Sequence, residues 1–312
     1  MRKLLTHSAM MMFLSCRQKY VYRQMQNIVP SARSTALVFG TAVHAGLECW
    51  FKTHDVTLAV DAAMSYAELD LEDSIKAGEL VRRYTEEYAD DAFTVLGVEQ
   101  KFEVPLKHPE TKRRSPLWNL AGKADGLVTI NDEIFILEHK TTSNINEDYW
   151  ARVDIDCQIM TYAIALQQQL KKPVAGAIFD VLKKPMIRMK QGETDEEFEQ
   201  RQRESKTGKV KRKVAETVEE FAERVQNELK PTDFARKTIR FSQSDLYDHW
   251  TRLWELSKDM TAVEKQRGCV YRNSSLCLGF NTCPYLKLCR CNGNVDLCKD
   301  DYTYLQANSE LQ

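Results

Sequence analysis

The stretch AGKADGLVTINDEIFILEHKTT, residues 121–142, decides the fold class. Apolar and polar residues alternate on either side of residues 131–133, which is typical of two antiparallel strands joined by a tight turn. Successive strand side chains point to opposite faces, so Glu138 and Lys140 share a face with apolar side chains that precede them. A buried β-hairpin that ends in a carboxylate and an amine raises the question of a reaction centre.

Asp125 begins the run that pairs across this turn, so its side chain can lie beside that of Glu138. Two carboxylates at the end of a buried hairpin repel one another unless a positive charge lies between them. A divalent cation meets this need, and oxygen ligands suit Mg²⁺ or Mn²⁺. Lys140 would then hold or polarise an attacking water or a phosphate oxygen. The alternative is a salt-bridged strand end, in which Glu138 pairs with Lys140 or Asp125 with Lys123.

The rest of the chain is predicted to surround this hairpin with helices. A polar, charged stretch at about 183–213 has no apolar period and indicates an exposed insertion. The order of the elements predicts an α/β protein with a mixed sheet flanked by helices. Helices are expected at 9–26 (capped by Ser8), 34–51, 55–76, 79–95, 147–170, 215–229 and 244–266, and further strands at 98–106, 174–182 and 236–241.

Composition limits the class of protein. The 312 residues are 43% hydrophobic and 29% charged, as in a soluble globular protein. No apolar run approaches the ~20 residues of a bilayer span, and the N-terminal stretch is unlike a signal peptide, so we expect a cytoplasmic protein without a membrane segment. The net charge of −1 does not favour nucleic acid. The basic clusters 107–114 and 206–213 would meet phosphates or form solvated loops.

Cysteine is concentrated near the end of the sequence. Six of the nine cysteines lie within residues 269–312, and clustered thiols in a reducing compartment point to metal. Three of them are spaced C-x5-C-x5-C in CLGFNTCPYLKLC (277–289), which is poor for zinc and suits an iron–sulfur cluster better. Spacing alone leaves the fourth ligand open among Cys16, Cys269, Cys291 and Cys298.

Four short motifs lie in a fixed order along the chain: GTAVH (40–44), GKADG (122–126), ILEHKTT (136–142) and QIMTY (158–162). Together they resemble the RecB-type branch of the PD-(D/E)XK nucleases, and are closest to its stand-alone phage and bacterial members. The resemblance covers nearly the whole chain. It implies a restriction-endonuclease-like core and a DNA substrate.

The resemblance also implies a metal site. Asp125 and Glu138 would bind the catalytic metal, Mg²⁺ or Mn²⁺, together with the backbone carbonyl of His139. His44 would be a further ligand on a helix that packs across the site. His139 stands where an apolar or small residue is common in the family, and we expect its side chain to face away from the metal.

Three more residues take roles by the same resemblance. Lys140 would orient the nucleophilic water, and Gln158 with Tyr162 would line the site and help to hold the DNA strand. Taken without the resemblance, a glutamine and a tyrosine one helical turn apart are usually no more than a polar edge.

A subset of RecB-type nucleases closes its fold with a 4Fe–4S cluster, which uses one cysteine in the first helix and three near the C-terminus. SAMMMFLSCRQKY (8–20) resembles that N-terminal motif, with Arg17 in place of the familiar proline. The cysteine-rich tail 269–312 would then close onto the nuclease domain 1–268, in a structural role. The implied ligands are Cys16, Cys277, Cys283 and Cys289, which leaves Cys291 and Cys298 unassigned.

We therefore expect a Mg²⁺- or Mn²⁺-dependent deoxyribonuclease. By family analogy it would be an exonuclease on linear ends or single strands, in recombination, repair or phage replication, in a bacterial or phage-infected cell. A helicase or a single-strand annealing protein would be a partner. One rival is a non-catalytic iron–sulfur or zinc protein that binds nucleic acid or a recombination partner, and another is an unrelated regulatory metal protein. The intact Asp125, Glu138 and Lys140 favour catalysis.

Overall fold

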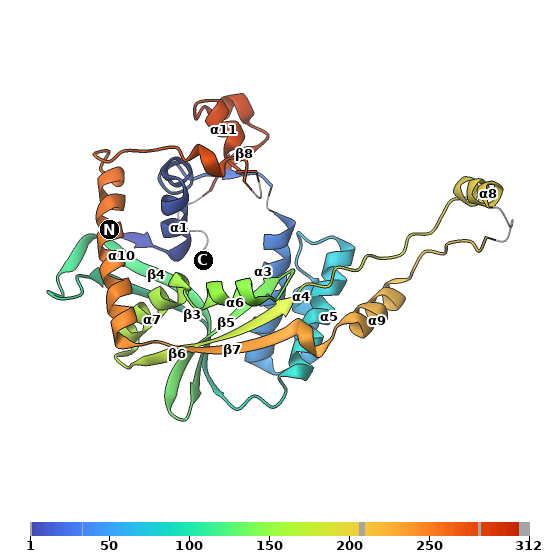
Figure 1. Cartoon of the computed structure of the whole chain (residues 1–312), viewed down its shortest axis with the longest axis horizontal. Coiled ribbons are helices and arrows are strands. Elements are labelled where there is room, and N and C mark those ends of the chain that lie inside the picture. The colour runs from blue at the N-terminus through green and yellow to red at the C-terminus, as the bar shows by residue number, and fades with distance from the viewer. Residues whose placement is uncertain (1, 33, 206–209, 280–281, 306–312) are drawn as a thin grey trace.

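A mixed six-stranded sheet forms the centre of the molecule (Figure 1). The computed structural model describes residues 2–32, 34–205, 210–279 and 282–305. The strands run in the order β1-β4-β5-β6-β7, and β3 pairs with β4. Their bounds are β1 (Lys3–Leu5), β3 (Thr94–Lys107), β4 (Arg114–Ile130), β5 (Glu133–Thr142), β6 (Val174–Lys183) and β7 (Phe234–Arg240).

Helices cover both faces of this sheet, as the sequence predicts. One hydrophobic core lies between the sheet and α1, α7 and α10, and a second lies between the sheet and α3, α4, α5 and α9. No helix in the described ranges is long and apolar enough to cross a membrane. The helices of these layers are α1 (His7–Ser15), α3 (Thr35–Thr53), α4 (Val56–Met64), α5 (Leu71–Glu87), α7 (Cys157–Leu170), α9 (Val218–Glu228) and α10 (Gln243–Glu264).

The predicted hairpin is formed by β4 and β5. Asn131 and Asp132 both have positive φ, 48° and 64°, which is the backbone of the two-residue turn that matches strand twist and that Asn and Asp tolerate. The antiparallel pairing runs from Ile130 opposite Glu133 to Gly126 opposite Leu137. Beyond that pair, β5 continues alongside the parallel β6, so the two strands of the hairpin separate at their far end.

The first predicted helix is wrong in its cap and its length. Thr6, and not Ser8, caps α1 by accepting a hydrogen bond from the backbone N–H of Ala9 at 3.2 Å. The helix stops at Cys16, whose φ of −161° and ψ of 112° are extended. After this break the chain continues as α2 (Arg17–Tyr20) and a π-helical turn (Val21–Met25).

The helix predicted at 147–170 is also two helices, α6 (Glu147–Val153) and α7. Asp156 breaks it, because its carboxylate accepts hydrogen bonds from the backbone N–H groups of Gln158 and Ile159 and so begins a new helix. The boundary between α4 and α5 lies at residues 65–70, earlier than predicted, because Asp70 caps α5.

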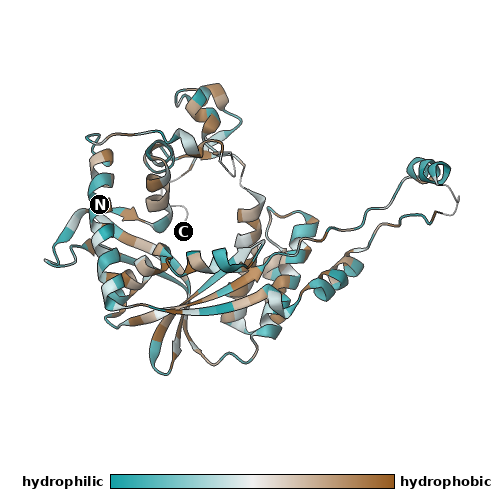
Figure 2. Cartoon of the chain, viewed as in Figure 1, coloured by the Kyte–Doolittle hydropathy of each residue, from teal (hydrophilic) through white to brown (hydrophobic). Residues whose placement is uncertain are grey.

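An arm of extended chain leaves the body between β6 and α9 and carries α8 (Asp195–Glu204) at a distance from the sheet (Figure 1). Its two sides are joined by the backbone hydrogen bonds Glu216 N to Lys190 O and Glu193 N to Lys213 O. No residue of α8 is buried, and Figure 2 shows this helix as mainly hydrophilic. The arm corresponds to the predicted polar insertion, of which 206–209 lie outside the described residues.

The tail packs against the start of the chain. Strand β8 (Tyr302–Tyr304) pairs antiparallel with β2 (Ile28–Pro30), and the ring of Tyr285 stacks between those of Tyr22 and Tyr302, with centroids 5.9 and 6.0 Å away. The remaining short elements are 3-10 helices at Pro231–Asp233, Ser274–Leu276 and Val295–Cys298, and α11 (Leu286–Arg290).

Candidate active site

Asp125 lies where β4 and β5 separate, one residue beyond the last paired position of the hairpin. Its Oδ2 accepts a hydrogen bond from the backbone N–H of His139 at 2.8 Å. The carboxylate thus accepts the hydrogen bond that a further residue of β4 would have accepted from β5. Extension of the β4–β5 register by one residue places Asp125 opposite Glu138. The sequence expectation that these two acidic residues meet at the end of the hairpin agrees with this arrangement.

Glu138 is buried in the middle of β5, just past the paired part of the hairpin, with its side chain 4% exposed. Its Oε1 accepts hydrogen bonds from Lys140 Nζ at 2.5 Å and from Gln158 Nε2 at 3.3 Å. Its Oε2 is buried and has no hydrogen-bond partner within the described part of the chain. A buried carboxylate oxygen without a donor is costly, so Oε2 is suited to a cation.

Gln158 and Tyr162 approach from α7. Gln158 accepts a hydrogen bond from Lys140 Nζ at 3.1 Å and donates one to the Tyr162 hydroxyl at 3.0 Å. Gly122 makes room for this tyrosine: a Cβ there would lie 2.9 Å from Tyr162 Cε1 and 2.5 Å from Phe102 Cζ. The glycine of the GKADG motif therefore serves the close packing of α7 on β4.

His44 completes the group from α3. Its Nδ1 lies 3.2 Å from Oδ1 of Asp125. The side chains of His44 and Lys140 are 32% and 30% exposed, whereas that of Asp125 is 14% exposed. The carboxylates therefore form the floor of the site, and the nitrogen-bearing groups lie toward its opening.

Charge pairing determines the ionisation of Asp125 and His44. Burial would raise the pKa of Asp125, but the charge of His44 and the hydrogen bonds from both histidines outweigh it and hold that pKa well below its usual value. Burial likewise opposes protonation of His44, and the neighbouring Asp125 outweighs it and raises the pKa of His44. Asp125 therefore remains ionised.

Glu138 behaves differently. Burial, aided by the negative charge of Asp125, raises the pKa of Glu138 to about 7, even though Lys140 opposes the change. Burial would lower the pKa of Lys140, but the charge of Glu138 outweighs it and raises that pKa, so the amine stays charged. Two neighbouring carboxyl groups with opposite pKa shifts are a mark of functional sites.

The donor set fits a divalent cation, although no complete site is assembled. Among the residues that the structure describes, no three His, Cys, Asp or Glu side chains are gathered so as to hold a metal ion. His44 is instead bonded to Asp125, and Lys140 to Glu138. The carboxylates of Asp125 and Glu138, the latter with its unpaired Oε2, are nevertheless oxygen ligands of the kind that Mg²⁺ or Mn²⁺ takes.

The side chain of His139 lies on the other face of the sheet from Glu138 and Lys140, among the rings of Phe51 and Tyr84. It is not remote from the site, however, because its Nδ1 is 3.4 Å from Oδ2 of Asp125.

Behind His139 lies a set of residues that the sequence did not single out: Tyr84, Asp91, Asp180 and Arg236. One signal was present, because Asp180 is an acidic residue in the otherwise apolar strand VAGAIFDVL (174–182).

The four cysteines of the expected cluster, Cys16, Cys277, Cys283 and Cys289, all line one cavity of about 230 Å³. The break between α1 and α2 brings Cys16 to this cavity, and burial raises the pKa of the Cys289 thiol.

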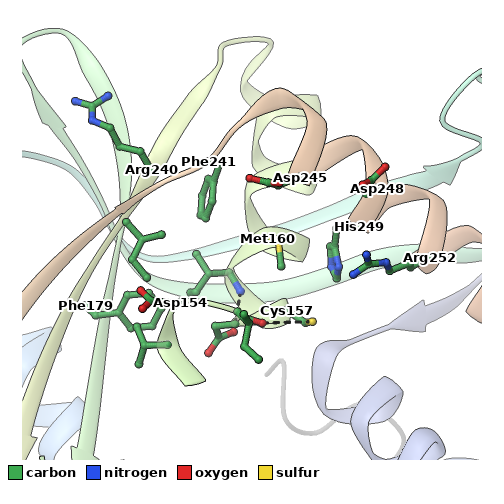
Figure 3. A pocket seen from close by; sticks show the side chains of 15 residues that line it. Asp154, Cys157, Met160, Phe179, Arg240, Phe241, Asp245, Asp248, His249 and Arg252 are labelled. Carbon is green, nitrogen blue, oxygen red and sulfur yellow. Dashed lines mark hydrogen bonds between the residues drawn. The ribbon is translucent and has the colours of Figure 1, made fainter. Parts of the chain in front are cut away.

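A larger cavity, of about 520 Å³, lies on the other flank of α7, between the end of β7 and the start of α10 (Figure 3). None of the expected site residues lines it. Asp154, Asp156, Asp245 and Asp248 contribute to its wall, with Arg240 and Arg252 as the cations. Four carboxylates would repel a phosphate, so this cavity is a poor candidate for the site of phosphodiester chemistry.

Comparison with known proteins supports the fold-level assignment. No curated protein sequence matches the chain. The solved structure titled "Crystal structure of SSO0001" aligns over 74% of this chain and 78% of its own, with 8% sequence identity and a TM-score of 0.30, and this likeness supports no inference. The family model of the PD-(D/E)XK nuclease superfamily matches residues 4–290, a span that contains every residue of the group described above. The chain therefore belongs to the PD-(D/E)XK nuclease superfamily.

Proposed function

We propose that this protein is a Mg²⁺- or Mn²⁺-dependent deoxyribonuclease of the RecB type that hydrolyses phosphodiester bonds in DNA. The observation that carries the proposal is the linked group at the end of the hairpin. There the unpaired, buried Oε2 of Glu138 lies beside the ionised Asp125, and Lys140 is bonded to the same glutamate. The Glu138–Lys140 ion pair of the alternative, a salt-bridged strand end, is present, but that alternative gives no role to an Oε2 that is buried without a partner.

In this proposal Asp125, Glu138, His44 and the backbone carbonyl of His139 hold the metal. When bound, the metal supplies Lewis-acid chemistry: it lowers the pKa of water and neutralises charge on the phosphoryl oxygens. Lys140 directs its charged amine at the water or at a phosphate oxygen.

Gln158 accepts a hydrogen bond from the amine of Lys140 and in turn donates one to Tyr162, which fixes the direction of that amine. Burial, then the charge of Glu138, raises the pKa of Tyr162 to about 12, so its hydroxyl remains a neutral donor to the DNA strand.

We favour exonuclease action on linear ends or single strands, in recombination, repair or phage replication, with a helicase or an annealing protein as partner. This finer assignment rests on the RecB-type resemblance. The basic residues of the arm would add phosphate contacts away from the site, which makes DNA binding dependent on salt.

We also propose that Cys16, Cys277, Cys283 and Cys289 hold a 4Fe–4S cluster. Their convergence on one cavity supports this. Four protein thiolates leave no open position on the cluster, so its role would be structural. It would tie the break after α1 to the tail and add the free energy of metal binding to the stability of the fold.

The test of catalysis is cleavage of labelled linear DNA with Mg²⁺ or Mn²⁺. Asp125→Ala and Lys140→Ala should each reduce the rate by about 100-fold or more while DNA binding is retained. Lys123→Ala is the matched control, since Lys123 belongs to the same hairpin but pairs with Glu99. If wild-type protein binds DNA and leaves it intact, the non-catalytic accessory role replaces this proposal.

Two further measurements test the finer points. Resistance of covalently closed circular DNA under conditions that degrade linear DNA supports exonuclease action, and cleavage of both forms contradicts it. Anaerobically purified protein should be brown and contain iron, whereas a colourless preparation with stoichiometric zinc would replace the cluster.

A further inference from the structure

An ion pair with a fully buried carboxylate lies behind the candidate site, on the two strands next to the hairpin. Asp180 of β6 and Arg236 of β7 are register partners, and Arg236 donates to both carboxylate oxygens, from Nε to Oδ1 at 2.5 Å and from Nη2 to Oδ2 at 2.7 Å. Asp91 binds the same guanidinium, which stacks on the ring of Tyr88 at 4.0 Å. A buried carboxylate with bidentate pairing is rigid and costly to disturb.

Tyr84 of α5 connects this ion pair to His139. Its hydroxyl donates to Oδ2 of Asp180 at 2.6 Å, and its oxygen is 3.2 Å from Nε2 of His139. A tyrosine has one proton, and burial together with the charge of Asp180 raises the pKa of Tyr84 so that the proton stays. Since that proton points to Asp180, Nε2 of His139 must be the donor to Tyr84. This sets the orientation of the imidazole.

His139 in turn joins this network to the metal ligands. Its backbone N–H donates to Oδ2 of Asp125 at 2.8 Å, its Nδ1 lies 3.4 Å from the same oxygen, and its carbonyl is one of the proposed ligands. His139 is buried, so a displaced ring would press on the groups packed around it and on the Asp125 carboxylate rather than move into solvent. His139, which is held by Tyr84, therefore sets the positions of two proposed metal ligands, the Asp125 carboxylate and its own backbone carbonyl.

We propose that Tyr84, Asp180 and Arg236 are positioning residues that hold Asp125 and the His139 carbonyl in place for the divalent cation, acting through the His139 ring. This inference rests on the proposed function. Partners of this kind, one shell outside the ligands, typically change metal affinity or activity by 10- to 100-fold when they are removed.

The test is Tyr84→Phe, which keeps the ring and removes the hydroxyl. Tyr88→Phe is the matched control one turn later, at the C-cap of α5, since its hydroxyl takes no part in the hydrogen bonds described above. Calorimetric titration of DNA-free protein with Mn²⁺ should show a dissociation constant raised about tenfold in Tyr84→Phe and unchanged in Tyr88→Phe. The Mn²⁺ concentration for half-maximal cleavage should rise equally, with the maximal rate approached at saturating metal.

A double-mutant cycle separates positioning from general loosening of the core. His139→Phe keeps an aromatic ring against Phe51 but breaks the link to Tyr84 and the contact with Asp125, so it should weaken Mn²⁺ binding at least as much as Tyr84→Phe does. The double variant should be no worse than His139→Phe alone. Effects that add, or a Tyr84→Phe protein that binds Mn²⁺ as the Tyr88→Phe control does, would overturn the inference.

Asp125→Ala distinguishes the failure of this inference from the failure of the proposed function. If Asp125→Ala loses Mn²⁺ binding and Tyr84→Phe does not, only the positioning role is refuted. If Asp125→Ala binds Mn²⁺ as wild type does, the metal site and the positioning role are both refuted.

Discussion

Replacement of Glu138 by glutamine should stabilise the metal-free protein, and increasingly so as the pH rises. Burial, then the charge of Asp125, raises the pKa of Glu138 from 4.5 to about 7. A group whose folded pKa is raised contributes stability below its unfolded pKa and loses that contribution as the pH rises through the folded value. At 1.36 kcal/mol per pKa unit, ionisation of this carboxyl costs about 3 kcal/mol of folding free energy. Glutamine mimics the protonated form and avoids this cost.

The assay is urea unfolding in EDTA between pH 5 and pH 8. Relative to wild type, Glu138→Gln should gain about 3 kcal/mol across this window, nearly all of it between pH 5 and 7. Glu133→Gln is the control: Glu133 lies on the same strand, and its hydrogen bond to Arg240 lowers its pKa, so this variant should show no such gain. Added Mn²⁺ should reverse the order by stabilising wild type alone. A difference between wild type and Glu138→Gln that does not change with pH would refute the reasoning.

Three further outcomes follow from particular contacts. Gly122→Ala should displace Tyr162, lower the cleavage rate and reduce the free energy of unfolding by about 1–3 kcal/mol. Gly126→Ala, whose Cβ would meet its nearest neighbour at 3.3 Å, should have a smaller effect in the same cleavage and unfolding assays. Cys16→Ser should lose iron and melt at a lower temperature, and Cys269→Ser, which lies outside the cavity, should retain iron by metal analysis. Replacement of residues 191–215 by a short glycine linker should leave the melting temperature within a few degrees, because it keeps the backbone hydrogen bond from Glu216 to Lys190 at the base of the arm, and should flatten the salt dependence of DNA binding.

The hairpin and the residues it carries were predictable because their signals are local. Alternation over 121–142 and an Asn-Asp turn specify two paired strands, and the pairing brings Asp125 opposite Glu138 without knowledge of the rest of the fold. The i, i+4 spacing of Gln158 and Tyr162 likewise set their common direction on α7.

The remaining features depend on contacts that no local pattern encodes. Apolar periodicity continues through Cys16 and Asp156, so it did not predict the breaks in two helices. Those breaks depend on side-chain capping and on the tertiary contacts of the residues at the break. Tyr84, Asp180 and Arg236 come from three separate elements, and only the assembled sheet brings them together.

The pairing of Ile28–Pro30 with Tyr302–Tyr304 has a consequence for how the molecule is made. Strand β2 leaves the ribosome long before β8, so the rings and backbone groups near Tyr22 stay uncovered while the chain between these two strands is made. Chaperones would have their longest opportunity to bind at the uncovered strand β2. A protease that cuts the linker after α10 would allow β2 and β8 to separate while the central sheet stays intact.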